Sequence, residues 1–234
     1  LNVPAVEVLD RLGPQRFVAS LRRGGLKLEL PRGGEPSLSV ILGGAAVNLE
    51  SLVGAYTAFA RGGLAGRPRY TADAPLHEAR LMSAGAAFIV RDILEAGGPL
   101  ARHVDGGVGA RRGIAWKTGT SFGFRDAWAV GVSDRYTVGV WVGRPDGTPN
   151  PGFFGANVAA PLLVDVFAAL EPPAATQRTP PPEVTQARVC WPLGTRADGL
   201  PPELCHRERT AWLLHDAAPP TFPDRLRDGA ARET

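Results

Sequence analysis

Residues 114–132 read IAWKTGTSFGFRDAWAVGV, and residues 136–143 read YTVGVWVG. The runs IAWKTG, AWAVGV and YTVGVWVG repeat with a period of two and are rich in aromatic and β-branched residues, which is typical of short β-strands. Ser133, Asp134 and Arg135 separate the last two runs as a turn. The stretch therefore predicts an antiparallel meander.

The sequence on either side of this meander has helical spacing. Asn48 and Ser83 are side chains that favour N-caps, and each precedes a run with apolar residues three and four positions apart. Helices before and after a hairpin sheet define an α+β fold, with an antiparallel sheet flanked by helices. The expected helices run from Asn2 to Gly13, up to about Arg23, from Asn48 to Gly62, from Ser83 to Gly97, and from Asn157 to Leu170. Their predicted inward residues include Leu52, Ala55, Tyr56 and Phe59, and then Phe88, Ile89, Ile93 and Leu94.

Composition indicates a globular protein. The chain of 234 residues is 44% hydrophobic and 21% charged, so it can bury a core. Its net charge of +3 comes from arginines scattered among acidic residues, without a run of like charges, and nucleic-acid binding is not expected. No stretch reaches the ~18 apolar residues of a membrane span. The chain opens with LNVP, without Met or a leader, so we expect a fragment or processed piece whose anchor lies upstream.

A proline-rich segment divides the sequence. Residues 171–183 read EPPAATQRTPPPE, which favours an extended spacer over a packed core. We therefore expect a first domain at residues 1–171, a linker at 172–188 and the start of a small C-terminal module at 189–234. Apolar residues of that module include Trp191, Leu193, Trp212, Leu213 and Leu214.

Lys117 is one of only two lysines in the chain and begins a Lys-Thr-Gly-Thr run on a predicted strand. Its ammonium group would attract an anionic substrate terminus and favour deprotonation of a nearby hydroxyl. Thr118 and Thr120 offer hydroxyl donors, Gly119 allows close backbone approach, and the Thr120 N–H could act as an oxyanion donor. A strand edge of this kind can hold a substrate as an added strand. The simpler interpretation is a surface lysine before a turn.

Several segments resemble the class A penicillin-binding proteins. K-T-G is one of three motifs shared by penicillin-binding proteins and serine β-lactamases, beside S-x-x-K and S-D-N or its relatives. IAWKTGTSFGFRDAWAVGV resembles the family's third and fourth strands, and SVILGGAAVNLESLVGAYTAFARGG resembles its Gly-Gly segment and core helix. The opening LNVPAVEVLDRLG resembles the residues after the Ser-x-Asn motif, with Asn2 as the asparagine and the serine directly before Leu1. VGVWVGRPDGTPNPGFFGANVAAPLL, RLMSAGAAFIVRDIL and the tail from VCWPLG to TAWLLHDAAPP extend the resemblance over nearly the whole chain.

The resemblance implies a partial transpeptidase fold of the penicillin-binding protein and β-lactamase type. It implies a D,D-transpeptidase of a bifunctional peptidoglycan synthase, with Lys117 and Asn2 as catalytic residues and with Thr118, Gly119 and Thr120 binding the substrate. The implied partners are peptidoglycan stem peptides, a lipid-linked precursor and β-lactams as substrate mimics. The implied location is the periplasmic side of the bacterial inner membrane, and neither cofactor nor metal is expected.

The first motif of the family is missing from this sequence. Three residues before the two lysines stand Gly24 and Ile114, so the chain contains no S-x-x-K. The nucleophilic serine is therefore expected upstream, and the chain alone is expected to be inactive.

Two other functions remain open. Residues 119–123, GTSFG, match the G-x-S-x-G elbow of α/β-hydrolases, which would make Ser121 a nucleophile with His206 or His215 as its base. That motif needs a strand before it and a helix after it. Alternatively, the chain is a non-catalytic module that binds cell wall or a partner protein, a description that fits the tail after Glu183 better than the first domain.

Cys190 and Cys205 are the only two cysteines and lie 15 positions apart in the part of the chain with the smallest core. The implied extracytoplasmic location permits a disulfide between them. Two buried free thiols are the alternative. A zinc site with His206 is not expected, because two cysteines without C-x-x-C spacing make a poor ligand set.

Overall fold

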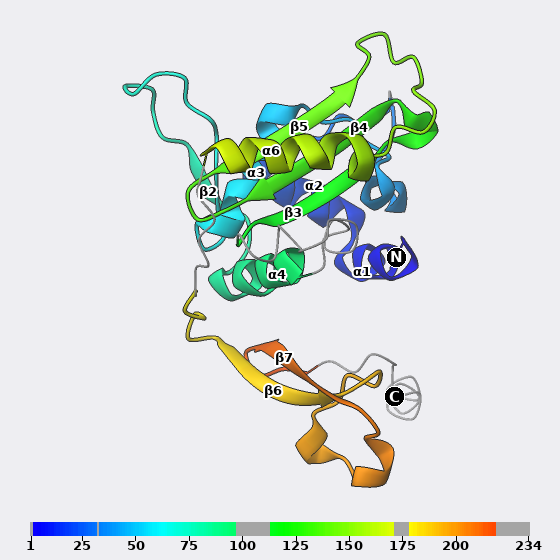
Figure 1. Cartoon of the computed structure of the whole chain (residues 1–234), viewed down its shortest axis with the longest axis vertical. Coiled ribbons are helices and arrows are strands. Elements are labelled where there is room, and N and C mark those ends of the chain that lie inside the picture. The colour runs from blue at the N-terminus through cyan, green and yellow to red at the C-terminus, as the bar shows by residue number, and fades with distance from the viewer. Residues whose placement is uncertain (1, 32, 97–112, 171–177, 219–234) are drawn as a thin grey trace. The chain divides into compact units, whose positions relative to one another are not determined.

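A computed structural model describes residues 2–31, 33–96, 113–170 and 178–218. The chain divides into two compact units, Leu1–Gln177 and Arg178–Thr234, which Figure 1 colours from blue to yellow-green and from yellow to red. Within the described ranges, no helix combines the length and the apolarity that crossing a bilayer requires.

The centre of the first unit is a three-stranded antiparallel sheet. Strands β3 (Ala115–Thr120), β4 (Asp126–Val132) and β5 (Thr137–Gly143) follow one another in the order β3-β4-β5, so the predicted meander is confirmed. The β4–β5 turn is closed by the Ser133 hydroxyl, which accepts a hydrogen bond from the Tyr136 N–H at 3.0 Å.

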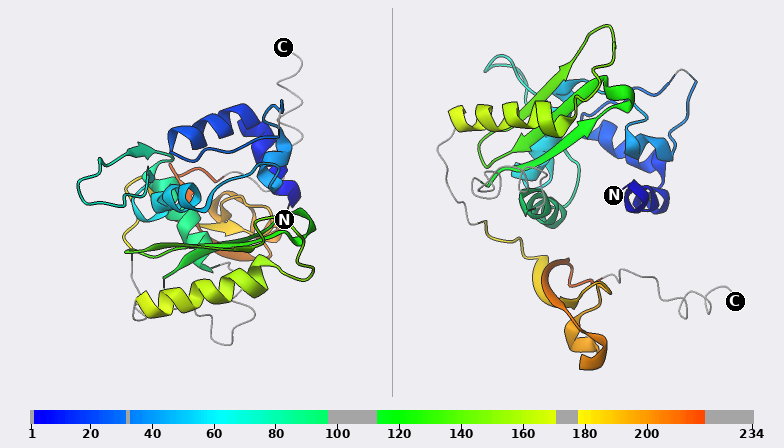
Figure 2. Two further views of the ribbon diagram at one scale, coloured as in Figure 1. Left: turned by 90° about the horizontal axis from the view of Figure 1, so that it is seen from above. Right: turned by 45° about the vertical axis from the view of Figure 1, so that its right-hand side comes forward.

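Helices cover both faces of this sheet (Figure 2), as the α+β prediction requires. Helix α6 (Ala160–Leu170) lies on one face, whereas α3 (Leu49–Ala60) and α4 (Ala84–Ala96) lie on the other. Two glycines let the helices approach closely. A Cβ atom at Gly131 would come within 2.7 Å of the Phe167 ring on α6, and one at Gly139 would come within 2.5 Å of Val53 on α3. The core therefore forms where sequence-distant elements meet a flat, small-residue part of the sheet.

Two predicted N-caps are confirmed. The Asn48 Oδ1 accepts the Ser51 N–H at 2.8 Å, and the Ser83 Oγ accepts the Ala86 N–H at 3.1 Å. The first two helices also lie where expected, as α1 (Asn2–Leu12) and α2 (Pro14–Arg23). The structure adds elements that periodicity did not predict. These are the 3-10 helix η1 (Leu38–Leu42) and a hairpin of β1 (Leu64–Gly66) with β2 (Glu78–Arg80).

The prediction that Ile93 faces inward is wrong, because its side chain is 60% exposed. Arg91 is buried in α4 instead, at 3% exposure. Its guanidinium group pairs with Glu95 at 3.1 Å and with Asp134 in the β4–β5 turn at 2.6 Å. These ion pairs compensate for burying the charge, and they orient the helix so that Ile93 faces solvent.

The second unit is an antiparallel ribbon of β6 (Val184–Cys190) and β7 (Glu208–Leu214), with the 3-10 turns η5 (Ala197–Gly199) and η6 (Pro202–Leu204) between them. The expected linker end at residue 188 is wrong, since β6 already begins at Val184. Val184 pairs with Leu214 and is buried, a contact that composition alone cannot indicate. Residues 172–177, the N-terminal part of the expected linker, lie outside the described residues, as does residue 171 before them.

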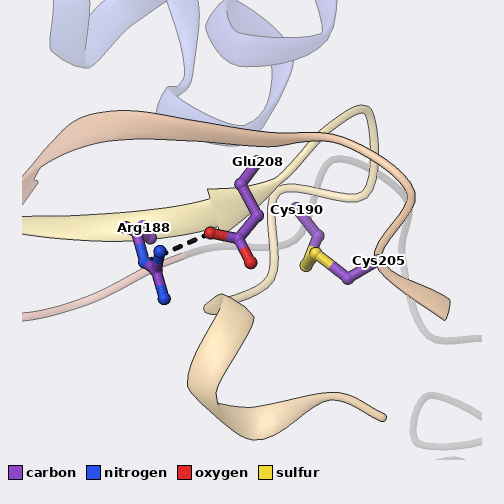
Figure 3. The surroundings of a disulfide bond; sticks show 4 residues. All are labelled: Arg188, Cys190, Cys205 and Glu208. Atoms are coloured by element: carbon purple, nitrogen blue, oxygen red, sulfur yellow. Dashed lines mark ion pairs between the residues drawn. A yellow bond between two sulfur atoms is a disulfide. The ribbon is translucent and has the colours of Figure 1, made fainter. Parts of the chain in front are cut away.

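A disulfide joins Cys190, the last residue of β6, to Cys205, just after η6 (Figure 3). The two Cα atoms are 5.3 Å apart, within the usual range for a disulfide. An ion pair of 3.1 Å between Arg188 Nε and Glu208 Oε2 crosses the ribbon beside it. The loop that carries η5 and η6 is thus tied back to the end of the ribbon.

Candidate active site

Strand β3, which carries Lys117, Thr118, Gly119 and Thr120, lies at the edge of its sheet. Just beyond β3, the Ser121 N–H donates to the Asp126 carbonyl at 3.0 Å. Hydrogen-bonded and non-hydrogen-bonded pairs alternate along an antiparallel ladder. The N–H and C=O groups of Thr118 and Thr120 therefore point away from β4, toward the free edge of the sheet, which no described strand covers. This edge can accept an extended peptide as an additional strand.

The Lys117 side chain lies on the sheet face that α3 covers. Lys117 pairs with Val130, and Val130 pairs with Gly139, whose position contacts α3. Directly paired residues share a face, so all three positions face away from α6. The side chain is exposed, and its Nζ donates to the Thr118 carbonyl at 2.5 Å. A flexible, accessible cation thus stands beside the free edge.

Next to Gly119 the same face carries two tryptophans that the sequence analysis did not single out. Gly119 pairs with Trp128, and Trp128 pairs with Trp141, whose ring centroid lies 6.3 Å from that of Trp128. The Trp141 Nε1 donates to Asp126 Oδ1 at 2.9 Å, which fixes the indole. Among the described residues, a Cβ atom at Gly119 would meet only the Trp128 Cβ, at an ordinary 3.6 Å, so these residues leave open space above the aromatic surface. The period-two pattern places each tryptophan on a strand, but only the register of β4 and β5 brings the two rings together.

Thr120 lies on the opposite face, toward α6. Its Oγ1 accepts the backbone N–H of Gly155 at 3.0 Å, from a segment 35 residues later in the chain. Thr120 itself is exposed. Its hydroxyl and the Lys117 ammonium group therefore flank the same strand edge from the two faces of the sheet.

Asn2 is in the first turn of α1 and is exposed. Among the described residues, no hydrogen bond connects it to β3. The structure thus brings Lys117, Thr118, Gly119 and Thr120 together on one strand, while the role of Asn2 stays a prediction.

The α/β-hydrolase alternative does not fit the observed topology. Ser121 follows a strand, but it leads into the 3-10 turn η3 (Phe122–Phe124) and then into the antiparallel strand β4, where the hydrolase elbow needs a helix. The Ser121 Oγ accepts the Asp126 N–H at 2.9 Å and so closes this turn. Ser133-Asp134 is likewise a hairpin turn, with Asp134 paired to Arg91.

A pocket of about 430 Å³ lies elsewhere in the first unit, between α2, α3 and the segment that joins β1 to β2. It is lined by polar and charged residues, among them Glu50, Arg67 and Tyr70, and a hydrogen bond with Glu50 raises the pKa of the Tyr70 phenol. None of its described lining residues belongs to β3. In the part of the chain that the structure describes, no group of three or more His, Cys, Asp or Glu side chains could hold a metal ion.

Comparisons of sequence and of structure both match this chain to penicillin-binding proteins. The penicillin-binding protein 1C linker domain family matches residues 183–213. Penicillin-binding protein 1C of Escherichia coli K12 is 48% identical over 228 residues, which is 95% of this chain but 29% of the relative. Penicillin-binding protein 1A of Clostridium tetani is 29% identical over 138 residues, or 55% of this chain and 17% of the relative. The 2.6 Å crystal structure of penicillin-binding protein 1A from Haemophilus influenzae matches with a TM-score of 0.69 at 19% identity, covering 94% of this chain and 39% of that one.

The fold is that of the matched region of penicillin-binding protein 1A, and over nearly its whole length the chain is similar in sequence to the class A penicillin-binding proteins. Within that class the chain is similar to penicillin-binding protein 1C, both in the first unit and in the linker domain that begins at residue 183. It spans less than a third of the length of the Escherichia coli relative.

Proposed function

We propose that this chain forms the C-terminal half of a D,D-transpeptidase domain in a bifunctional peptidoglycan synthase. The observation that carries the proposal is the free edge of β3, where outward-facing backbone groups of Thr118 and Thr120 are flanked by the Lys117 ammonium group. An extended stem peptide that ends in D-Ala-D-Ala fits such an edge, because its backbone can complete the ladder and its terminal carboxylate meets a positive charge.

In the proposed reaction a serine that lies upstream of this chain attacks the carbonyl carbon of the penultimate D-Ala. The peptide bond breaks, the terminal D-Ala leaves with a proton on its nitrogen, and an acyl-enzyme ester remains. An amine from a neighbouring strand then attacks the ester and releases the serine. The Thr120 N–H serves as an oxyanion donor, and Lys117 favours proton removal from the upstream hydroxyls. By family resemblance, Asn2 belongs to the same proton-transfer machinery.

Lys117 provides the direct test, with the other lysine of the chain as its matched control. In the full-length protein that contains this chain, Lys117→Ala is expected to lower the second-order rate of acylation by fluorescent penicillin at least about tenfold, or ~1.4 kcal/mol of transition-state stabilisation. Lys27 is exposed and lies between α2 and η1, so Lys27→Ala should keep the parent rate. If Lys117→Ala kept the rate within about twofold, Lys117 would not be part of the site.

Residues 1–234 expressed alone are expected to bind no penicillin covalently. The described β3 site supplies an edge, a cation and an oxyanion donor, and S-x-x-K is absent from the sequence. Labelling that survives denaturation and maps to Ser121 would revive the hydrolase alternative.

We further propose that this protein works on the periplasmic side of the inner membrane, held by an anchor outside this chain, with a lipid-linked precursor as the source of its glycan strands. The second unit then acts as a non-catalytic spacer or binding module, in keeping with its linker-domain match. Binding of the isolated ribbon to polymeric cell wall, compared with binding to a D-Ala-D-Ala peptide, tests that role. Binding to the peptide alone would contradict it.

A further inference from the structure

The segment that leads into α6 contacts the end of β3. It begins at Phe154 and forms a π-helical turn, η4 (Gly155–Ala159), directly before α6. Gly155 is buried, and a Cβ atom there would lie 2.5 Å from the Trp128 carbonyl oxygen and even closer to that of Gly119. Only glycine allows this backbone to approach β3 and β4 so closely, and the approach brings the Gly155 N–H within 3.0 Å of Thr120 Oγ1.

The turn is held in place from both sides. The Asn157 Oδ1 accepts the Phe154 N–H at 2.8 Å, and the Asn157 Nδ2 donates to the Gly152 carbonyl at 2.9 Å. At its other end, Ala159 and Ala160 are fully buried in the core between the sheet and α6. Single π-helical turns occur frequently at functional sites. This one places a backbone donor against a hydroxyl group of the candidate active site.

We propose that Gly155 is a positioning residue, whose amide orients the Thr120 hydroxyl so that its hydrogen points toward a carboxylate at the free edge of β3. A hydroxyl oxygen that accepts one hydrogen bond directs its own proton elsewhere, and Thr120 is exposed on the edge strand of the sheet. The chain from amide to hydroxyl to carboxylate also strengthens each bond by polarisation. This inference rests on the proposed function and adds to it the positioning role of Gly155 and of the turn η4 that holds it.

Two ligands that differ in whether their carboxylate is free distinguish the positioning role of Gly155 from a purely structural one. Acylation rates of the full-length protein are measured with benzylpenicillin, which carries a free carboxylate, and with its methyl ester, which does not. Thr120→Val is expected to lower the benzylpenicillin rate about tenfold and to change the ester rate less than about twofold. Gly155→Ala is expected to lower the benzylpenicillin rate more than the ester rate, because its Cβ atom would also displace the β3 backbone on which both ligands depend. Thr120→Ser, which keeps the hydroxyl, should restore the rate. The double variant should be no slower than either single one, because both changes remove the same interaction.

Gly131→Ala is the matched control. It adds the same methyl group at another close contact of the sheet, on β4, but there the group meets the Phe167 ring and not the site. It is expected to lower the melting temperature while changing both acylation rates less than about twofold. Asn157→Ala provides a second test of the turn in case Gly155→Ala does not fold. It frees the turn without adding a clash at Gly155, and it should reproduce the carboxylate-specific loss.

The outcomes separate the two proposals. If Gly155→Ala and Asn157→Ala slow the acid and the ester equally, or if Thr120→Val slows benzylpenicillin while both turn variants do not, the positioning role is wrong. If Lys117→Ala and Thr120→Val both leave the benzylpenicillin rate unchanged, the proposed function of β3 itself fails.

Discussion

The two units of this chain are stabilised in different ways. The first unit buries large side chains between its sheet and α6, and Leu163 and Phe167 are each only 1% exposed. The second unit is a two-stranded ribbon, whose described buried residues are Val184, Val189, Cys190 and Leu213. A two-stranded ribbon is marginally stable on its own, so it depends on its disulfide and on ion pairs at its surface.

This difference accounts for where the candidate chemistry lies. Catalytic groups must be held within a fraction of an ångström of their working positions, which requires a packed scaffold. Strand β3 has such a packed scaffold beside it. Ala127 and Ala129 on β4, which pair with Thr120 and Thr118, are at most 1% exposed. A disulfide-linked ribbon with a small core is better suited to connecting domains or to binding a partner. Changes to the core, to the disulfide and to the surface charges test this comparison in order of decreasing effect.

The largest effect is expected in the core of the first unit. Phe167→Ala should destabilise that unit by about 3–5 kcal/mol, because it removes a buried ring and leaves a cavity against Gly131 and Leu163. Hydrogen exchange followed by mass spectrometry during a urea titration would report the two units separately. The second unit should keep its midpoint.

Phe122→Ala is the matched control, since Phe122 is 96% exposed and the same atoms are removed from solvent-facing surface. It should change the free energy of unfolding by less than about 0.5 kcal/mol. Equal losses for the two variants would mean that α6 does not hold the sheet by packing.

Much of the first unit could be predicted because its signals are local. The period of two between residues 114 and 143 and the caps at Asn48 and Ser83 depend on neighbours a few positions apart. The three-residue strands β1 and β2 are too short to show a period. Arg91 faces inward because of Asp134, far away in the sequence, so helical spacing alone could not show that Arg91 is buried and Ile93 is exposed.

The same division applies to the candidate site. Lys117 to Thr120 form a contiguous motif and could be recognised from the sequence. The contact of Gly155 with Thr120 spans 35 residues, and the tilted contact of Trp128 with Trp141 depends on the register of two strands. Such contacts exist only after the chain has folded, and no local pattern specifies them.

The next largest effect is expected from the disulfide. Protein made in an oxidising compartment should contain no alkylatable thiol, which mass spectrometry after denaturation can establish. Replacing Cys190 and Cys205 by alanine should destabilise the second unit by roughly 3 kcal/mol in the chain-entropy model for a loop of this length. Hydrogen exchange in β6 and β7 should accelerate while β3 to β5 keep their protection.

Two alkylatable thiols in such protein would contradict the prediction directly. Unchanged exchange in the double alanine variant would instead show that the ribbon is stabilised by its side-chain contacts, and the contrast between the units would be lost.

The smallest effect is expected from acidification of the second unit. Arg196 pairs with Asp198 at 3.0 Å and with Asp216 at 2.8 Å. The hydrogen bond from Arg196 holds the pKa of the Asp198 carboxyl below its ordinary value, with further help from the charges of Arg196 and Arg188.

Because the pKa of Asp198 is lower in the folded ribbon than in the unfolded chain, the unfolded chain binds more protons as the pH falls. The contribution of Asp198 to stability is therefore present above the ordinary pKa of aspartate, about 4, and is lost as the pH drops through the lowered value. The group is exposed, so solvent and salt keep the effect small. Between pH 7 and pH 3 the urea midpoint of the ribbon should fall further in the parent protein than in Asp198→Asn, whereas Glu203→Gln, an exposed change in the same unit, should follow the parent. If Asp198→Asn lost as much stability on acidification as the parent, the ion pairs of Arg196 would not stabilise the ribbon, and the disulfide would carry that role without them.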